Sequence, residues 1–245
     1  MCSGITLVIG ANGLIGSSFV SLLKQKRRDV VGVDACSGPN TDFVRSVSGY
    51  RDIEDIWTDI AKKYAYISLV YAAGKNGSVE HGGLTERYSM DAKDEAAYFH
   101  ANVLIPQDIS LGIVQACDEM YDKVNLIIWI VVSHYGHTAA NDNLYPSGCF
   151  KPIGYITSKH AAIGLVKALA SRFSSERISV NGFSPGGVLN GQNTEFQEKY
   201  RQYVPVGRLA IPDEIAIWMG AVMDPLNPVY ATGSVVNVDG GALSW

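Results

Sequence analysis

The chain has 245 residues, of which 47% are hydrophobic and 18% charged, and its net charge at neutral pH is −4. This balance excludes an intrinsically disordered chain and argues against a nucleic-acid-binding protein, which shows a basic excess or stripe. With only four cysteines a disulfide scaffold is excluded, and because they form no CxxC pair, neither a metal site nor a redox motif is predicted.

Short runs rich in valine and isoleucine alternate with helix-like segments along the chain. The runs are residues 5–9, 30–33, 67–71, 126–132, 178–183 and 235–238, and the helix-like segments are residues 14–26, 53–63, 94–119 and 155–172. Continuous apolar runs of this length are typical of strands buried on both faces of a parallel sheet. We therefore predict a doubly wound, Rossmann-like α/β fold with three layers, α/β/α.

The same apolar runs bear on the location of the protein. The longest, residues 126–132, falls far short of the ~20 residues that a membrane helix needs. The run at residues 5–9 is too short for the core of a secretory signal. We expect one cytoplasmic domain over residues 1–245, with a small-molecule substrate and neither a membrane nor a nucleic-acid partner.

The first predicted strand leads directly into a glycine-rich turn and then into a helix. Gly10 allows a tight turn, and Gly13 lets a pyrophosphate approach the backbone. Gly16 lets the helix pack closely on the strand. The helix N-terminus offers free N–H groups and the positive end of its dipole to phosphates. Glycines also mark ordinary turns, but the place of these between a strand and a helix favours a dinucleotide site. Its residues are Gly10, Asn12, Gly13, Leu14, Ile15 and Gly16.

An acidic residue, Asp34, ends the second predicted strand. A carboxylate at this place accepts hydrogen bonds from the ribose hydroxyls of adenosine and repels a 2′-phosphate. The alternative is a solvated aspartate in a turn, which the preceding glycine turn makes the weaker interpretation. Asp34 therefore predicts NAD in preference to NADP.

Tyr155 and Lys159 open a long apolar helix and, being four residues apart, share one helix face. A lysine ammonium near a phenol favours the phenolate and lowers the pKa of the phenol from about 10. Such a tyrosine is a competent acid or base for exchange between a hydroxyl and a carbonyl. Ser133 ends the buried run at 126–132, where open α/β sheets bind their ligands. These residues predict a catalytic group.

In this order along the chain, these features resemble the short-chain dehydrogenase/reductase family. The resemblance covers nearly all of the chain and includes the glycine turn, Asp34, Asp52-Ile53, Ala72-Ala73-Gly74, Asn102, Ser133, Tyr155 with Lys159, Ser184-Pro185-Gly186-Gly187, and Thr232-Gly233 with Val238-Asp239-Gly240-Gly241. It implies an NAD(P)-dependent oxidoreductase that transfers a hydride between nicotinamide and a secondary alcohol or ketone.

The resemblance also implies roles for single residues. Tyr155 would be the general acid/base, Lys159 would hold the nicotinamide ribose, Ser133 would orient the substrate oxygen, and Asn102 would hold a water that relays protons. The adenine would meet Asp52 and Ile53, the cofactor would pass Ala72, Ala73 and Gly74, and the nicotinamide would lie along Pro185, Gly186 and Val188. Taken alone, each of these residues could also have a purely structural role. Asp52, for example, could be a helix N-cap.

The chain departs from the family pattern in several places, of which three bear on the fold and the substrate. The GxxGxxG spacing resembles that of extended members, many of them sugar-nucleotide epimerases and dehydratases, whose extra substrate domain does not fit in this length. The segment between Asp34 and Arg51 is brief, so we expect the second crossover helix to be short or missing. The third departure is a long insert, residues 134–154, rich in Asn, Gly, Pro and aromatic residues.

A long loop at a catalytic edge is a candidate substrate loop, although a solvated loop is an equal alternative. We take His134, Tyr135, Tyr145 and Gly187 as substrate candidates, and polar residues such as Lys151 could bind hydroxyls or a phosphate. Residues 189–211 are expected to form a lid. The insert and the segment after Pro185 resemble a subgroup found with bacterial surface-sugar and nonulosonic-acid biosynthesis, which implies a sugar or phosphosugar substrate.

The long helix-like segments at 94–119 and 155–172 are apolar on more than one face. One face would cover the sheet and the other would meet a partner, and the family resemblance implies a homodimer or homotetramer. Two further functions stay open: a sugar-modifying dehydratase or epimerase with tightly bound NAD, and a non-catalytic NAD-sensing module.

Overall fold

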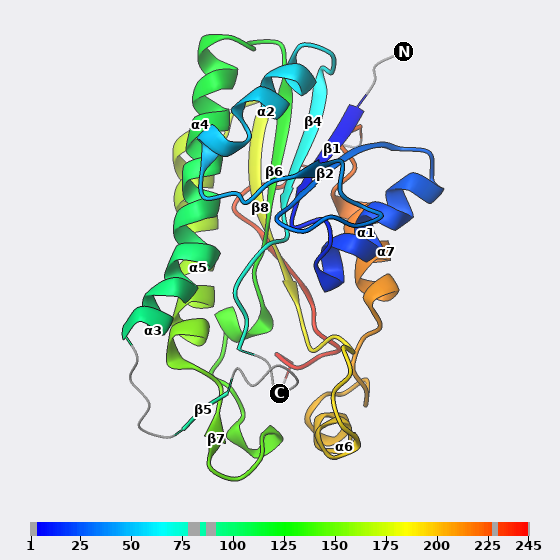
Figure 1. The fold of residues 1–245 in the computed structure, drawn as a ribbon, viewed down its shortest axis with the longest axis vertical. Coiled ribbons are helices and arrows are strands. Elements are labelled where there is room, and N and C mark those ends of the chain that lie inside the picture. The colour runs from blue at the N-terminus through cyan, green and yellow to red at the C-terminus, as the bar shows by residue number, and fades with distance from the viewer. Residues whose placement is uncertain (1–3, 78–83, 87–91, 227–229, 245) are drawn as a thin grey trace.

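The structure, a computed structural model, describes residues 4–77, 84–86, 92–226 and 230–244. Within these residues a seven-stranded sheet has the order β3-β2-β1-β4-β6-β8-β9, and every neighbouring pair is parallel. The strands are β1 (Gly4–Ile9), β2 (Asp29–Asp34), β3 (Phe43–Val44), β4 (Tyr66–Tyr71), β6 (Asn125–Val131), β8 (Ile178–Pro185) and β9 (Val235–Val238). Helices cover both faces of this sheet, which confirms the predicted doubly wound fold (Figure 1).

The α-helices are α1 (Leu14–Gln25), α2 (Glu54–Ala61), α3 (Ala92–Phe99), α4 (Ile105–Glu119), α5 (Ile153–Phe173), α6 (Thr194–Tyr203) and α7 (Pro212–Val222). A π-helical turn, η2 (His100–Leu104), joins α3 to α4, and the short 3-10 turns are η1 (Tyr50–Asp52), η3 (His134–Gly136) and η4 (Asp142–Leu144). Two short strands, β5 (Thr85–Glu86) and β7 (Cys149–Phe150), pair antiparallel. No described helix has the length and apolarity to cross a bilayer.

Alternate residues of each central strand supply two hydrophobic cores. In β1, Leu7 and Ile9 pack into the core under α2, α4 and α5, whereas Val8 packs into the core under α1 and α7. Because side chains alternate across a strand, only a strand covered on both sides makes every position apolar. The run of apolar residues therefore reflects two covering layers of helices.

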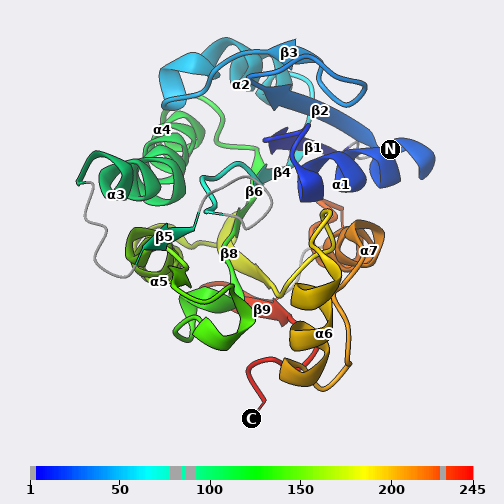
Figure 2. The same ribbon diagram turned by 60° about the horizontal axis from the view of Figure 1, so that its bottom comes forward.

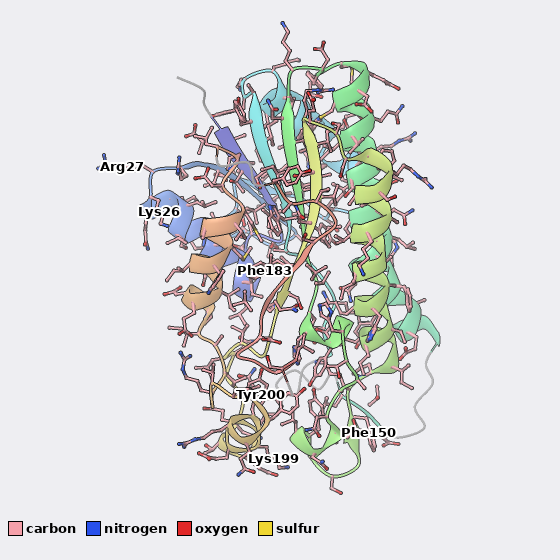
Figure 3. All side chains as sticks on the ribbon, turned by 180° about the vertical axis from the view of Figure 1, so that it is seen from behind. Lys26, Arg27, Phe150, Phe183, Lys199 and Tyr200 are labelled. Atoms are coloured by element: carbon pink, nitrogen blue, oxygen red, sulfur yellow. The ribbon has the colours of Figure 1, made fainter. Side chains whose placement is uncertain are left out.

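The carboxyl ends of the parallel strands meet at one edge of the molecule, at the bottom of Figure 1. The β5–β7 pair and α6 lie at this same end, as the tilted view of Figure 2 also shows. From behind, Phe183 of β8 lies near the middle of the molecule, and Tyr200 of α6 and Phe150 of β7 lie towards that end (Figure 3). Ligands of open α/β sheets bind at this edge.

The structure refines three predicted segments. The helix expected at residues 94–119 is α3, the π-turn and α4 in succession. No helix stands between β2 and β3, which agrees with the short second crossover expected before Arg51. The insert at 134–154 is not a bare loop: it contains η3, η4 and β7, and α5 begins before its end.

Candidate active site

A cleft of about 610 Å³ opens at the carboxyl edge of the sheet, a size typical of a small-molecule site. It is lined by Gly10, Asn12, Gly13, Leu14, Ile15, Asp34, Cys36, Ala72, Ala73, Gly74, Lys75, Asn76, Val131, Val132, Ser133, His134, Tyr135, Tyr145, Lys151, Tyr155, Lys159, Pro185, Gly186, Gly187, Val188, Asn190, Gln192, Phe196, Tyr200 and Leu209. The cleft thus brings together most of the predicted cofactor, catalytic and substrate residues.

The glycine turn has the geometry that a pyrophosphate needs. Gly10 has φ +91°, donates to Val33 O at 2.8 Å, and lies so close to Ala73 that a Cβ would meet the Ala73 nitrogen at 2.5 Å. A Cβ on Gly13 would touch only Gly10 O, at 3.4 Å, and the N-terminus of α1 has no side-chain cap. The backbone N–H groups of the first turn of α1 are therefore open to a phosphate.

Gly16 has a different place from the other two glycines. It does not line the cleft, and a Cβ there would clash with the Gly10 carbonyl oxygen. Its lack of a side chain lets α1 pack against the turn, as its position in the motif predicts.

Asp34 closes the outer end of the cleft. Its Oδ2 accepts the Asn12 N–H at 2.9 Å and its Oδ1 accepts the Cys36 N–H at 3.0 Å. The Asn12 side chain in turn donates to Cys36 O at 2.6 Å and to Thr41 Oγ1 at 2.5 Å. A carboxylate oxygen accepts more than one hydrogen bond, so Asp34 is held in place and still offers acceptors to a ribose.

Asp52 and Ile53, which were predicted to meet the adenine, do not line the cleft. The Asp52 carboxylate accepts N–H groups of Ser48 and Gly49, at 2.7 and 3.2 Å, and so caps the turn that leads into α2. These bonds hold the pKa of Asp52 below its usual value, with the Ser48 hydroxyl as the largest cause. Ile53 is fully buried in the core below α2.

Tyr155 is buried at the floor of the cleft beside Ser133. Burial raises the pKa of Tyr155, and a hydrogen bond from the Ser133 hydroxyl opposes that rise. Two further tyrosine rings pack edge-on against it: Tyr98 at 6.1 Å and Tyr135 at 6.4 Å between ring centroids. The lowered pKa expected for Tyr155 is not found, because burial of the phenol outweighs the groups that favour its ionised form.

Lys159 lies one helical turn beyond Tyr155 and is equally enclosed. Its Nζ donates to Val131 O at 3.3 Å and lies 5.9 Å from the centroid of the Tyr155 ring. Burial lowers the pKa of Lys159 to about 8. The ammonium therefore reaches both the strand end and the face of Tyr155, as the shared helix face predicts.

Asn102 is buried in the π-turn and does not line the cleft itself. Its side chain pairs with both backbone groups of Lys75: Oδ1 accepts the Lys75 N–H and Nδ2 donates to Lys75 O, each at 3.1 Å. Nδ2 also donates to Ser158 Oγ at 2.9 Å. Asn102 thus fixes the chain after Gly74 against α5. A π-turn in a helix often marks a functional site.

The four substrate candidates all line the far half of the cleft. The hydroxyls of Tyr135 and Tyr145 are hydrogen-bonded at 2.9 Å, and His134 stacks on Tyr135 at 4.1 Å between ring centroids. Gly187 donates its N–H to the Tyr200 hydroxyl at 2.7 Å. Tyr200 belongs to α6, which falls within the segment expected to form a lid.

The lining residues that escaped sequence analysis include Cys36, Lys75 and Asn76. Lys75 and Asn76 directly follow the Ala-Ala-Gly segment, so a strand end next to a glycine was the signal that could have found them. Tyr98 was also missed, although it packs on Tyr155 from α3. Tyr98 precedes Asn102 on a predicted helix, and nothing in the sequence there indicated this contact.

Comparison with known proteins finds a matching family model and several similar enzymes. A family model described as enoyl-(acyl carrier protein) reductase matches residues 149–242. The chain is 23% identical to an acetoacetyl-CoA reductase of Synechocystis sp. over 241 residues, 96% of this chain and 95% of the relative. It is 31% identical to the cis-1,2-dihydrobenzene-1,2-diol dehydrogenase of Pseudomonas putida over 171 residues, which span 59% of this chain and 60% of that protein.

Solved structures share the fold over the whole chain. A short-chain dehydrogenase of Leptospira borgpetersenii with bound NAD+ superposes with a TM-score of 0.84 at 22% identity, covering 99% of this chain and 93% of that one. Others with this fold hold NADH, as in a 4-hydroxyisoleucine dehydrogenase, or NADP, as in ElxO, both at a TM-score of 0.78. Together with the family match and the sequence relatives, they show that the chain is similar to short-chain dehydrogenases/reductases, which are NAD(P)-dependent oxidoreductases.

Proposed function

We propose that this protein uses NAD to oxidise a secondary alcohol, or to reduce the matching ketone, with Tyr155 as general acid/base. The observation that carries the proposal is that the hydroxyls of Ser133 and Tyr155 and the ammonium of Lys159 line the same cleft as the open glycine turn. A buried pair of hydroxyls beside a dinucleotide cradle is the arrangement that moves a proton at a carbinol oxygen. Nicotinamide, when bound, supplies the hydride chemistry.

Each side chain has a separate task in this proposal. In oxidation, the Tyr155 oxygen takes the proton of the substrate hydroxyl, and in reduction it returns that proton. Ser133 donates to the substrate oxygen and keeps it within reach of Tyr155. Lys159 stabilises the ionised phenol and holds the ribose next to the nicotinamide. Asn102 holds the chain at Lys75, and through it the edge of the cofactor site.

The preference for NAD rests on Asp34. Its carboxylate stands at the outer end of the cleft, fixed by two backbone N–H groups, where the adenosine ribose is expected. A 2′-phosphate there would face a like charge at short range, which opposes binding. Pro185, Gly186 and Val188 line the opposite part of the cleft and would hold the nicotinamide.

The substrate half of the cleft favours a molecule with one apolar face and several polar groups. Tyr145, Phe196 and Tyr200 form a row of rings, with 6.0 Å between successive centroids. Asn190, Gln192 and Lys151 supply polar groups to the same cavity. Flat apolar walls with a few polar groups suit a sugar ring or another cyclic alcohol. A sugar or phosphosugar is therefore the first substrate class to test.

Assembly into a homodimer or homotetramer is part of the proposal. The helices α3, α4 and α5 and the π-turn η2 bear exposed apolar side chains at Phe99, Leu104, Leu111 and Ile153. Leu104 is 52% exposed and Ile153 is 70% exposed. Several such side chains on neighbouring helices are typical of a surface that another chain covers.

The test compares the wild type with Tyr155→Phe on NAD+ and a panel of secondary alcohols, cyclic diols and sugar phosphates. We expect turnover to fall by about 10²- to 10⁴-fold in the variant, while NADH binding, measured by fluorescence, is retained. Tyr121→Phe, remote from the cleft, should keep full activity.

Three results would contradict the proposal. Activity that survives in Tyr155→Phe would remove the assigned role of the phenol. Purified protein that carries NAD and gives no net turnover of free NADH would point instead to a dehydratase or epimerase that recycles its cofactor. A wild type that binds NADH without any turnover across the panel would point to an NAD sensor.

A further inference from the structure

Lys151 lies nearer to the ring of Tyr155 than the lysine of the YxxxK motif does. Its Nζ is 4.5 Å from the centroid of the Tyr155 ring, whereas Lys159 Nζ is 5.9 Å away. Lys151 stands just before α5 in the insert, lines the cleft and is only 9% exposed. A second ammonium group therefore lies against the face of the phenol that performs the proton transfer.

The position of Lys151 is fixed from the other side of the cleft. Its Nζ donates to Asn76 Oδ1 at 2.7 Å and to Gly77 O. These acceptors follow the Ala-Ala-Gly segment of the cofactor site, and Asn102 fixes the same stretch through Lys75. The contacts hold the ammonium over the ring and connect it to the chain that borders the cofactor.

A cation over an aromatic ring is attracted by the electron density of the ring face. When the phenol loses its proton, the negative charge spreads into the ring, so the same cation is attracted more strongly to the phenolate than to the phenol. An opposite charge within about 4–6 Å favours the ionised form by roughly 1 to 3 pKa units. Burial works against ionisation of Tyr155, so a nearby cation has a clear function here.

The other groups that contact Tyr155 do not place a cation so close to its ring. Tyr98 and Tyr135 present neutral rings, Lys159 is more distant from the ring, and the Ser133 hydroxyl is neutral. Further out, the Tyr145 hydroxyl bonds to Tyr135, and the Glu95 carboxylate lies against Gly154, the residue before Tyr155.

We propose that Lys151 is a positioning residue for the reaction, which stabilises the ionised form of Tyr155 from the face of its ring. The inference rests on the proposed role of Tyr155 as acid/base. It assigns to the insert a part in catalysis beyond substrate recognition, because the insert carries Lys151 to the ring.

The decisive measurement follows the ionisation of residue 155 directly and needs no substrate. 3,5-Difluorotyrosine in place of Tyr155 gives one ¹⁹F NMR signal, and its more acidic phenol titrates where the protein stays folded. In the NAD+-bound protein we expect Lys151→Gln to raise the pKa of this phenol by about one unit or more. Lys151→Arg, which keeps the charge, should restore most of the wild-type value.

The controls separate this effect from a general loss of structure. Lys62→Gln makes the same exchange at an exposed site on the far side of α2 and should leave the titration unchanged. Lys151→Met repeats the test should Lys151→Gln fail to bind NADH. For an alcohol that the wild type oxidises, the acidic limb of the rate profile should move to higher pH with Lys151→Gln and return with Lys151→Arg.

A titration of residue 155 that is the same with and without the Lys151 ammonium would overturn the inference. This outcome is distinct from failure of the proposed function, which appears as activity in Tyr155→Phe. An unchanged titration combined with an inactive Tyr155→Phe would leave the acid/base role intact and remove Lys151 alone.

Discussion

The Asp34 side chain performs a structural and a selective task at once. Its two oxygens accept backbone N–H groups of Asn12 and Cys36, and its charge faces the place where a 2′-phosphate would lie. Asp34→Asn keeps an acceptor but removes the charge. We expect the ratio of NADPH to NADH affinity to rise about tenfold or more, because a like charge at close range opposes the phosphate.

Fluorescence titration with both reduced cofactors measures this ratio. Asp42→Asn is the matched control, since the Asp42 carboxylate also accepts a backbone N–H, from Gly32 at 2.7 Å, but does not line the cleft. An unchanged ratio in Asp34→Asn would show that the carboxylate does not select the cofactor.

His134 makes folding sensitive to acid. Burial lowers its pKa from 6.5 to about 4, while its contact with Pro185 O works in the opposite direction. In the unfolded chain His134 takes up a proton below pH 6.5, whereas in the folded chain it does so only near pH 4. Stability from this group is therefore present above pH 6.5 and lost as the pH falls towards 4, by at most about 3 kcal/mol.

His134→Asn removes the titrating group, so its stability should fall less steeply between about pH 7 and pH 4.5 than that of the wild type. Urea unfolding at both pH values gives the comparison. His160→Asn, at an exposed position, should keep the wild-type slope. Equal slopes for all three proteins would mean that other groups cause the loss in acid.

At the scale of elements, α6 is tied to the end of β8 by one hydrogen bond. The Tyr200 hydroxyl accepts the Gly187 N–H at 2.7 Å, and the Tyr200 ring packs between Phe196 and Tyr203. Tyr200→Phe keeps the ring and leaves the N–H without its acceptor, at a cost of about 1–3 kcal/mol. We expect faster hydrogen exchange of the Gly187 amide and of α6, and a higher KM for substrate.

Mass-spectrometric hydrogen exchange locates the change along the chain. Tyr121→Phe, far from α6, should exchange as the wild type does. Uniformly faster exchange in Tyr200→Phe would indicate global destabilisation, and no change in α6 would mean that ring packing alone holds this helix.

The elements also show what a sequence can predict. The central strands were predictable because two layers of helix make every position apolar, as in β1. The two-residue strand β3, Phe43–Val44, lies at the sheet edge with both side chains exposed, so it leaves no apolar run. The local bonds of Asp52 to Ser48 and Gly49 were not predictable, because residue spacing does not reveal them.

The residues of the site also fall into a predictable and an unpredictable group. Residues that precede or follow strands, such as Ser133 and Asp34, were predictable because parallel strands end at one edge. Contacts made by loops and helix faces were not: Lys151 reaches Tyr155 only because Asn76 and Gly77 hold it from another segment. The identity of a substrate depends on contacts of this second kind.

At the scale of the whole molecule, the outer face of α5 carries an unusual residue for a long helix. Gly164 is exposed in the middle of α5, and a Cβ there would meet no atom of the protomer within 4 Å. Glycine in a helix interior costs about 1 kcal/mol relative to alanine, so this position calls for a reason outside the protomer. Close approach of a second copy supplies one, and the neighbouring Ala168 is likewise small and exposed.

If copies of the chain pair through α5, Gly164→Arg should dissociate them and leave each protomer folded, because the open space around Gly164 accepts the side chain within one protomer. Light scattering at about micromolar concentration should give a dimer or tetramer for the wild type and for Gly164→Ala, and a monomer for Gly164→Arg with an unchanged circular dichroism spectrum. A monomeric wild type would refute the assembly itself. An intact oligomer in Gly164→Arg would move the interface to another face, because an arginine at close contact between two copies leaves no room for their helices to meet.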